Sequence, residues 1–328
     1  MENTTRLLER QQALLAGRHA LIVDADDAAL AHLPAARITL HGELASLPLD
    51  QAQVLPDVPA DTDLLIIILP KSRERLDLLL AALAGSITRP TECWLVGPGK
   101  GGIRGALKQF AALCGEPESL DSARHCKLFR GTLSPHPPVT LDQFERRWHC
   151  DGLTLCSLPG VFSHGRLDDG TALLLDTLAD ITLHGPVLDI GCGAGILTAQ
   201  LARRGLEVSA VDVSTSAVAA TERSLAANDL TARVYHSDLY SGLPGGAGAP
   251  RFRTVISNPP FHDGLAHHTG ITQRLISEAP RHLQRGGSLW LVANQGLPYG
   301  DWLAQHFAQV TVAQENRRFR VWHARLQN

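Results

Sequence analysis

Short apolar runs alternate with longer amphipathic stretches in the first half of the chain. Runs of about four to eight apolar, β-branched residues are typical of buried strands, whereas apolar positions three or four apart favour helices. Strands are predicted at residues 20–23, 37–40, 64–69, 93–96 and 127–129, and helices at 73–83 and 103–114. Strands that alternate with helices indicate βαβ units and a mostly parallel sheet.

The same alternation starts again in the second half. Strands are predicted at residues 187–190, 208–211, 233–236, 254–257 and 288–293, with helices at 171–179, from 196, after 214 and at 272–283. The runs at 310–312 and 319–322 predict a C-terminal hairpin. Pro280 falls inside the last helix, where a proline removes a backbone donor, so a kink or break is expected there.

Length indicates two domains. The chain has 328 residues, of which 44% are hydrophobic and 19% charged, an ordinary globular composition. Single cores rarely grow beyond about 250–300 residues. Pro135, Pro137 and Pro138 mark the predicted connection. The expected domains are residues 1–150 and 151–328, both of the α/β class.

Net charge, apolar runs and cysteine spacing indicate the class of protein and its compartment. A formal charge of −3 gives no general attraction to polyanions, so binding to nucleic acid would need local patches such as Arg146-Arg147 or Arg317-Arg318. The first residues lack the apolar core of a signal peptide, and the longest apolar run, residues 64–69, is far shorter than a bilayer span of ~20 residues. The six cysteines form no Cys-x-x-Cys pair, which predicts reduced thiols and no metal site. A soluble cytoplasmic protein with no membrane interaction is expected.

A glycine-rich turn follows the first strand of the second half. Gly191, Gly193 and Gly195 lead directly into a predicted helix, where the backbone can approach a ligand closely. Three glycines alone are a weak signal. Asp212 strengthens it, because this residue ends the next strand, 21 residues after Gly191, where a carboxylate can accept hydrogen bonds from ribose hydroxyls. Asp238 follows the third strand and can accept from an adenine amino group.

The fourth strand, residues 254–257, ends at Asn258-Pro259-Pro260-Phe261. The prolines cannot donate to a ladder, and Pro259 keeps Asn258 extended at the edge where open α/β sheets bind ligands. The Asn258 oxygen and a neighbouring backbone carbonyl are two acceptors suited to a flat amino group whose ring stacks on Phe261. The alternative is a strand that simply ends in a capping Asn and a core Phe.

Two other interpretations of the whole domain are weaker. A plain α/β core does not explain three ligand-facing strand ends in the order of a nucleotide-binding fold. A nicotinamide oxidoreductase requires Gly-x-Gly-x-x-Gly, but position 196 is Ile, and no His–Asp pair for hydride transfer is evident.

These motifs together resemble the seven-stranded S-adenosylmethionine-dependent methyltransferases that alkylate exocyclic nitrogens. Residues 158–163 (Leu-Pro-Gly-Val-Phe-Ser), 258–264 (Asn-Pro-Pro-Phe-His-Asp-Gly) and 318–321 (Arg-Phe-Arg-Val) narrow the resemblance to the bacterial 16S rRNA (guanine(1207)-N2)-methyltransferase family. The close motifs cover roughly residues 150–328, and in the first half the resemblance is mainly architectural.

The resemblance implies two tandem Rossmann-like class I methyltransferase domains, the second with a seven-stranded, mostly parallel sheet. Residues 151–328 would be catalytic, and residues 1–150 would be a degenerate domain for RNA docking or folding support. The implied cofactor is S-adenosylmethionine. The implied partner is 16S rRNA or the 30S ribosomal subunit, bound by a monomeric enzyme.

The resemblance also implies a role for each motif. Asn258 Oδ1 and the Pro259 carbonyl would orient the N2 amine of a guanine, while Pro260 completes the stiff turn and Phe261 stacks on the base. Asp212 would hold the ribose of the cofactor and Asp238 its adenine. The implied cofactor-binding residues are Asp189, Gly191, Gly193, Gly195, Asp212, Asp238 and Leu239.

Three alternatives stay open at this point. The related 23S rRNA guanine-N2 methyltransferases have a similar architecture, although His-Asp-Gly after the motif favours the small-subunit family. Protein-glutamine N5-methyltransferases share the Asn-Pro-Pro element but usually continue with Tyr. A non-catalytic RNA-binding module with a vestigial cofactor pocket is the third.

Overall fold

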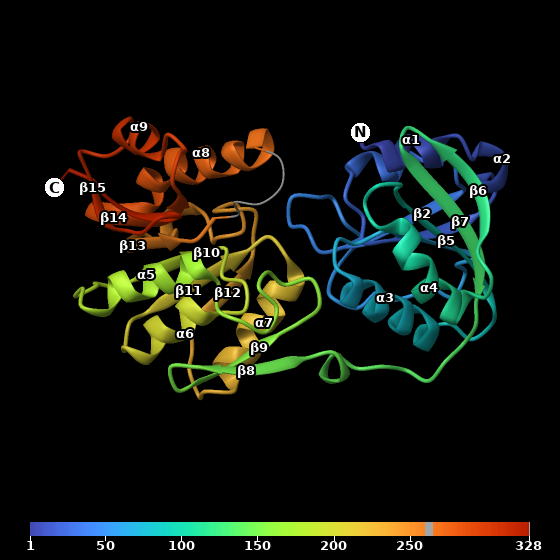
Figure 1. Cartoon of the computed structure of the whole chain (residues 1–328), viewed down its shortest axis with the longest axis horizontal. Coiled ribbons are helices and arrows are strands. Elements are labelled where there is room, and N and C mark those ends of the chain that lie inside the picture. The colour runs from blue at the N-terminus through green and yellow to red at the C-terminus, as the bar shows by residue number, and fades with distance from the viewer. Residues whose placement is uncertain (260–264, 328) are drawn as a thin grey trace. The chain divides into compact units, whose positions relative to one another are not determined.

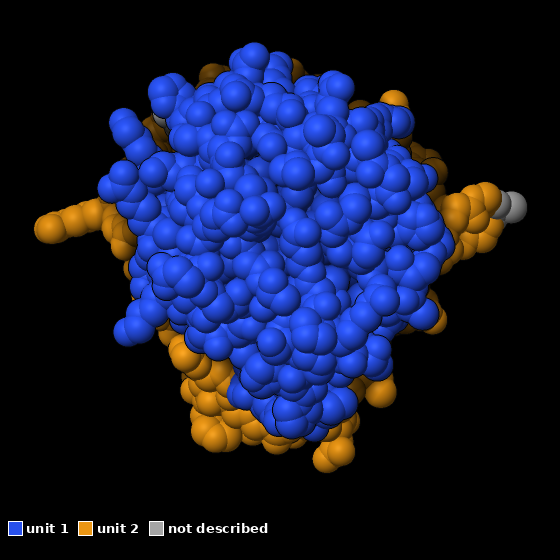
Figure 2. All heavy atoms as spheres, turned by 90° about the vertical axis from the view of Figure 1, so that its right-hand side faces the viewer, with its two compact units in different colours: residues 1–145, 158–160 blue, residues 146–157, 161–328 orange. Residues whose placement is uncertain are grey.

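The structure is a computed structural model that describes residues 1–259 and 265–327. The chain forms two compact units (Figure 1). Unit 1 comprises residues 1–145 and 158–160, and unit 2 comprises residues 146–157 and 161–328. Figure 2 distinguishes the surface atoms of the two units by colour. Within the described residues, no helix has the length and apolar character needed to cross a membrane.

Unit 1 is built on a seven-stranded sheet in the order β3-β2-β1-β4-β5-β7-β6, in which β1 to β5 are parallel and β7 pairs antiparallel with both β5 and β6. Its strands are β1 (His19–Val23), β2 (Arg37–Gly42), β3 (Gln51–Ala52), β4 (Leu64–Ile68), β5 (Thr91–Pro98), β6 (Glu118–Ala123) and β7 (Cys126–Leu133). Its helices are α1 (Asn3–Glu9), α2 (Gln12–Leu15), α3 (Arg73–Ser86) and α4 (Ile103–Cys114), with 3₁₀ turns η1 (Ala28–His32) and η2 (Leu141–Gln143).

The core of unit 1 lies on both faces of this sheet. Successive side chains of a strand point to opposite faces, so Leu21 packs with α3 and α4 while Ile22 packs with Leu7 and Leu8 of α1. A strand buried on both faces reads as a continuous apolar run, as β4 does.

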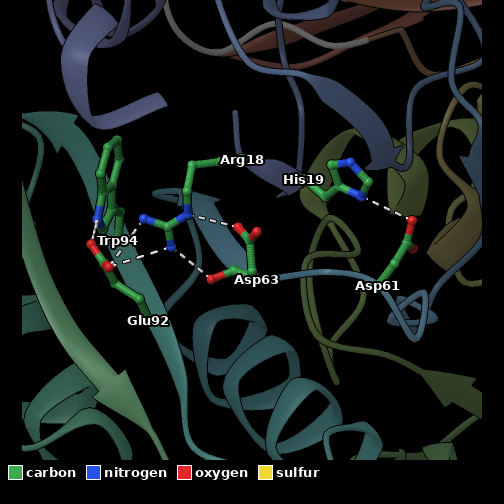
Figure 3. A network of polar contacts seen from close by, with 6 residues as sticks. All are labelled: Arg18, His19, Asp61, Asp63, Glu92 and Trp94. Atoms are coloured by element: carbon green, nitrogen blue, oxygen red, sulfur yellow. Dashed lines mark hydrogen bonds and ion pairs between the residues drawn. The ribbon is translucent and has the colours of Figure 1, made fainter. Parts of the chain in front are cut away.

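Polar contacts join the N-terminal ends of three neighbouring strands of unit 1 (Figure 3). Arg18, just before β1, donates from Nε to Asp63 Oδ1 at 2.7 Å, and its Nη1 and Nη2 lie 3.3 Å from Glu92 Oε2 in β5. His19 Nδ1 lies 2.9 Å from Asp61 Oδ2. These contacts stabilise the sheet at the edge opposite to the one where open α/β sheets bind ligands.

Unit 2 contains a second seven-stranded sheet with an equivalent order, β12-β11-β10-β13-β14-β16-β15. Its strands are β10 (Val187–Ile190), β11 (Val208–Asp212), β12 (Arg233–His236), β13 (Phe252–Ser257), β14 (Leu283–Asn294), β15 (Gln309–Glu315) and β16 (Phe319–Arg325), and a separate ribbon pairs β8 (Arg146–Cys150) with β9 (Leu153–Ser157). Its helices are α5 (Asp169–Ala179), α6 (Ile196–Arg203), α7 (Thr215–Ala226), α8 (Leu265–His282) and α9 (Tyr299–Ala304), with a 3₁₀ turn η3 (Gly246–Gly248).

Helices cover both faces of this sheet as well. Leu188 and Ile190 of β10 pack with Leu275 of α8, whereas Val187 packs with Leu174 of α5 and α6 lies on the same face. Two seven-stranded, mostly parallel sheets confirm the predicted fold class, and β15 pairs with β16 as the predicted hairpin.

Pro280 does not break its helix. Helix α8 runs through this residue and ends two residues later at His282. The helix has many turns before Pro280, and the bond that a proline omits falls in the last turn, so the helix continues to its end.

Candidate active site

The glycine turn of unit 2 leaves an open backbone surface at the start of α6. Gly191, Gly193 and Gly195 have φ angles of 78°, 56° and 82°, a region that favours glycine. A Cβ built on Gly191 or Gly193 would meet no atom of the described residues within 4 Å. The turn therefore has room for a ligand against its backbone, at a helix N-terminus that favours negative charge.

Asp212 ends the neighbouring strand β11 and holds this turn. Its Oδ2 accepts from the Gly193 N–H at 3.0 Å and its Oδ1 from the Ser214 N–H at 2.9 Å. Burial raises the pKa of Asp212, and the amide hydrogen bonds oppose that rise. A carboxylate has about four lone-pair sites, so Asp212 keeps acceptor capacity beyond these amide hydrogen bonds, which suits it to the hydroxyls of a ribose.

Asp189 lies in β10 beneath the turn and is fully buried. Its Oδ2 accepts from Thr198 Oγ1 at 2.6 Å, which connects β10 to α6. Burial raises the pKa of the Asp189 carboxyl to about 7, with a further contribution from the nearby charge of Asp212. In this structure Asp189 supports the turn from within the unit.

Asp238 follows β12, and its carboxylate contacts a residue that the sequence pattern did not identify. Arg274 of α8 donates from Nη1 to Asp238 Oδ2 at 3.1 Å and also lies 3.5 Å from Glu278. Leu239 is buried, with a left-handed φ of 51°, and its carbonyl accepts from Ser237 Oγ at 2.7 Å. Asp238 and Leu239 thus stand at the third strand end, with α8 alongside.

Asn258 follows β13, and its amide is held at one end only. Nδ2 donates to Asp168 Oδ2 at 2.9 Å and to Thr171 Oγ1 at 2.7 Å, which uses both of its hydrogens. Oδ1 is buried and accepts no hydrogen bond from any residue that the structure describes. A buried acceptor without a partner costs roughly 1–3 kcal/mol, so this oxygen is suited to accept from a donor group of a ligand.

Pro259 is buried directly after Asn258. The remaining residues of the predicted motif, Pro260 and Phe261, lie outside the described residues, as do residues 262–264.

These strand ends lie at one edge of the sheet. Strands β12, β11, β10 and β13 are adjacent and parallel, so the residues that follow them meet at the carboxyl edge, where open α/β sheets bind ligands. The structure therefore brings together the glycine turn, Asp212, Asp238 and Asn258, as the sequence predicted.

A groove of about 550 Å³ runs between the first turns of α5 and the turn that joins β15 to β16. Arg317 and Arg318 line it, and Arg318 Nη1 lies 2.9 Å from Asp169 Oδ2. Asp169 follows Asp168 directly, so the groove begins beside the residues that hold Asn258. Both partners of this ion pair are well exposed, and such pairs are worth little, so Arg318 can exchange its carboxylate for another anion.

Comparison with known proteins agrees with this geometry. Residues 152–323 match the family model of the methyltransferase small domain, and residues 5–148 match its N-terminal domain. The ribosomal RNA small subunit methyltransferase C of Alcanivorax borkumensis is 49% identical, with 99% of each chain covered. The corresponding protein of Aeromonas hydrophila is 36% identical, with 97% of this chain and 96% of that protein covered.

The chain belongs to the ribosomal RNA small subunit methyltransferase C family. Members of this family are S-adenosylmethionine-dependent methyltransferases, which confirms the predicted family, enzyme class and cofactor. A solved structure, the 16S rRNA N2 G1207 methyltransferase of T. thermophilus in complex with AdoMet and guanosine, superposes with a TM-score of 0.86 at 24% identity. It covers 99% of this chain and 92% of that one, so the two-sheet fold extends over the whole length.

Three residues of the site were not found from the sequence. Asp168 and Thr171 lie 90 and 87 residues before Asn258, and Arg274 lies 36 residues after Asp238. Asp-Asp-Gly-Thr before an apolar helical run is a signal for a helix N-terminus, and Asp168 indeed caps α5. Nothing local connects that cap to Asn258.

Proposed function

We propose that this enzyme transfers a methyl group from S-adenosylmethionine to the exocyclic N2 of a guanine in 16S rRNA, with Asn258 orienting the target amine. The observation that carries the proposal is the buried Oδ1 of Asn258, which has no partner among the described residues, beside an Nδ2 whose two hydrogens are both donated. An oxygen fixed in this way accepts from an amino group and rejects a carbonyl, so it discriminates the N2 amine of guanine from the oxygen-bearing edges of other bases.

The cofactor fits the residues at the sheet edge. Gly191 and Gly193 leave room along the backbone, Asp212 has free acceptor sites for ribose, and Asp238 and Leu239 stand where the adenine would lie. Asp189 would support the turn from below through Thr198. When bound, S-adenosylmethionine supplies an electrophilic methyl group.

The chain's own residues position the nucleophile. Asn258 Oδ1 and the Pro259 carbonyl would accept the two N–H groups of the amine, which holds the nitrogen in place and favours its lone pair as it becomes tetrahedral. Phe261 would stack on the base, a contact worth roughly 1–3 kcal/mol that offsets the cost of taking the base out of its stack. The amine can lose its proton after methylation, so no strong base is needed, and positioning supplies most of the rate.

The partner is 16S rRNA or the small ribosomal subunit, and the enzyme acts as a monomer in the cytoplasm. The arginine-lined groove beside α5 supports RNA binding, because it presents cations to the phosphates that flank a base held at Asn258. Residues 151–328 form the catalytic domain, and residues 1–150 serve RNA docking or folding support.

Single-turnover methyl transfer to 16S rRNA tests the role of Asn258. Asn258→Ala removes one preorganised contact and should lower the rate about 10²–10³-fold with little change in cofactor affinity. Asn228→Ala is the matched control, because Asn228 donates from Nδ2 to Thr154 and Ser224 carbonyls and accepts from the Thr154 N–H, so its amide is used within the unit. A near wild-type rate for folded Asn258→Ala would contradict the proposal.

A further inference from the structure

The nitrogen of the Asn258 amide donates hydrogen bonds to two residues at the start of α5. Asp168 Oδ2 and Thr171 Oγ1 accept its two hydrogens at 2.9 and 2.7 Å. We propose that Asp168, assisted by Thr171, is a positioning residue that sets the direction of the Asn258 amide and so points Oδ1 at the target amine. The inference rests on the proposed function of Asn258.

The direction of this amide matters because its two ends are alike in shape and opposite in polarity. With the amide reversed, an NH₂ group would face the amino group of the base, donor against donor. A hydroxyl such as that of Thr171 can donate or accept, so it accommodates both directions, whereas a carboxylate only accepts. Asp168 therefore selects the direction, and Thr171 strengthens whichever direction is selected.

Asp168 is itself fixed by the helix it caps. The same Oδ2 that accepts from Asn258 also accepts from the Gly170 and Thr171 N–H groups, both at 3.0 Å. Gly170 packs closely here: a Cβ at this position would lie 3.1 Å from Asp168 Oδ2 and 3.4 Å from Asn258 Oδ1. The N-terminus of α5 thus holds the carboxylate, and the carboxylate holds the amide.

Two substitutions separate this role from helix capping. In Asp168→Ser the hydroxyl can still cap α5, but the side chain is shorter and can also donate, so the Asn258 amide loses both its fixed direction and its fixed position. In Asp168→Asn the Gly170 and Thr171 N–H groups draw the side-chain oxygen toward themselves, which leaves the same acceptor facing Asn258. We expect Asp168→Ser to lower the single-turnover rate about 10- to 100-fold, and Asp168→Asn to restore it to within about threefold of wild type.

Thr171→Val should lower the rate less than Asp168→Ser does, because the carboxylate still selects the direction. Thr177→Val is its matched control: Thr177 lies on the same helix and bonds to Leu173 and Gln314 instead, so the rate should not change. The cofactor dissociation constant, measured by calorimetry, should be unchanged in all four variants.

A double-mutant cycle with Asn258→Ala decides between positioning and a merely structural role. If Asp168 acts through the amide, Asp168→Ser should cause no further loss of rate in the Asn258→Ala background. An equal loss in both backgrounds, or a wild-type rate for Asp168→Ser alone, would overturn the inference while leaving the role of Asn258 intact. A wild-type rate for Asn258→Ala alone would instead overturn the proposed function, and this inference with it.

Discussion

The two sheets share one strand order but differ in the residues that follow their strands. The last residue of β1 pairs with Ile67 of β4, and the last residue of β10 pairs with Ser257 of β13. One position further on, unit 1 has Ile68 where unit 2 has Asn258. Ile68 is buried and apolar, so unit 1 carries no amide at the position that is proposed to orient a substrate amine.

The first strand of each sheet also pairs with a strand on its other side, β2 in unit 1 and β11 in unit 2. Comparison of these pairs gives a second difference. Gly42 in unit 1 stands where unit 2 has Asp212, and Asp24 replaces Gly191 directly after the first strand. Asp24 keeps the left-handed conformation of that position, with φ of 60° against 78° for Gly191. Unit 1 therefore has the same backbone conformation at this position as unit 2. It lacks both the carboxylate suited to ribose and the glycine suited to close approach by a ligand.

In unit 1 this edge is occupied by ion pairs formed within the unit. Arg75, in the first turn of α3, is almost fully buried, and its Nε lies 2.8 Å from Asp24 Oδ1 and 3.1 Å from Glu43 Oε2. In unit 2 the equivalent edge has open glycines and an acceptor on Asn258 that no described residue uses. Strand order alone thus does not make a binding site, because one edge is closed by its own ion pairs and the other leaves acceptors for a ligand.

The largest effect on stability is expected from removing Arg75, whose ion pairs occupy the carboxyl edge of the unit 1 sheet. Arg75→Ala leaves two carboxylates without their cation in a largely buried position, which should reduce the free energy of unfolding by about 3–5 kcal/mol. Arg37→Ala, which removes an exposed contact with Asp61 in the same unit, should leave the free energy of unfolding close to that of the wild type. Urea unfolding measures both. Weakened cofactor binding by folded Arg75→Ala would show that the unit 1 edge is a ligand site after all.

Most of the fold was predictable because its signals are local. The strands are short apolar runs, and the glycine turn needs a left-handed backbone. Asp212 ends one strand and Asn258 directly follows another, and the pairing of adjacent strands places both at one edge. The predicted strand ends therefore converge as expected.

The contacts that orient the side chains were not predictable. The Asp168–Asn258 hydrogen bond joins positions 90 residues apart, and the ion pair between Arg274 and Asp238 depends on how α8 packs beside the segment that follows β12. Likewise, Arg75 reads as an ordinary polar residue in the first turn of a helix, and only the packed structure shows that it is 2% exposed.

A smaller effect is expected at Asp212, which ends β11 and has Gly42 as its counterpart in unit 1. Asp212→Ala removes the acceptors proposed for ribose and frees the Gly193 N–H, so cofactor binding should weaken by about 1–3 kcal/mol. Calorimetry should find one site per chain in the wild type, because Gly42 offers no carboxylate in unit 1. Asp301→Ala, an exposed acidic residue of unit 2, is the control and should bind like the wild type. Two equivalent sites, or unchanged affinity for Asp212→Ala, would contradict the inferred difference in cofactor binding between the two sheet edges.

The smallest effect concerns the buried residue beneath the glycine turn. Asp189 of β10 corresponds to Ile22 of β1, so unit 2 buries a carboxyl where unit 1 buries a hydrocarbon. Burial raises the pKa of Asp189 to about 7, above its unfolded value, so the folded protein holds the proton more tightly than the unfolded chain does. The stability from this group is therefore complete at low pH and is lost as the pH rises through 7.

Asp189→Asn keeps an acceptor for the Thr198 hydroxyl and removes the titration. Between pH 6 and pH 7.5 the wild type should lose about 1 kcal/mol of unfolding free energy relative to this variant. Urea unfolding of both proteins at the two pH values measures that difference, in which the other titrating groups cancel. Ile22→Val removes one buried methylene at the corresponding position of unit 1, and its destabilisation should be the same at both pH values. A difference between the wild type and Asp189→Asn that stays constant over this interval would show that the carboxyl is already ionised in the folded state at pH 6, which would contradict the raised pKa.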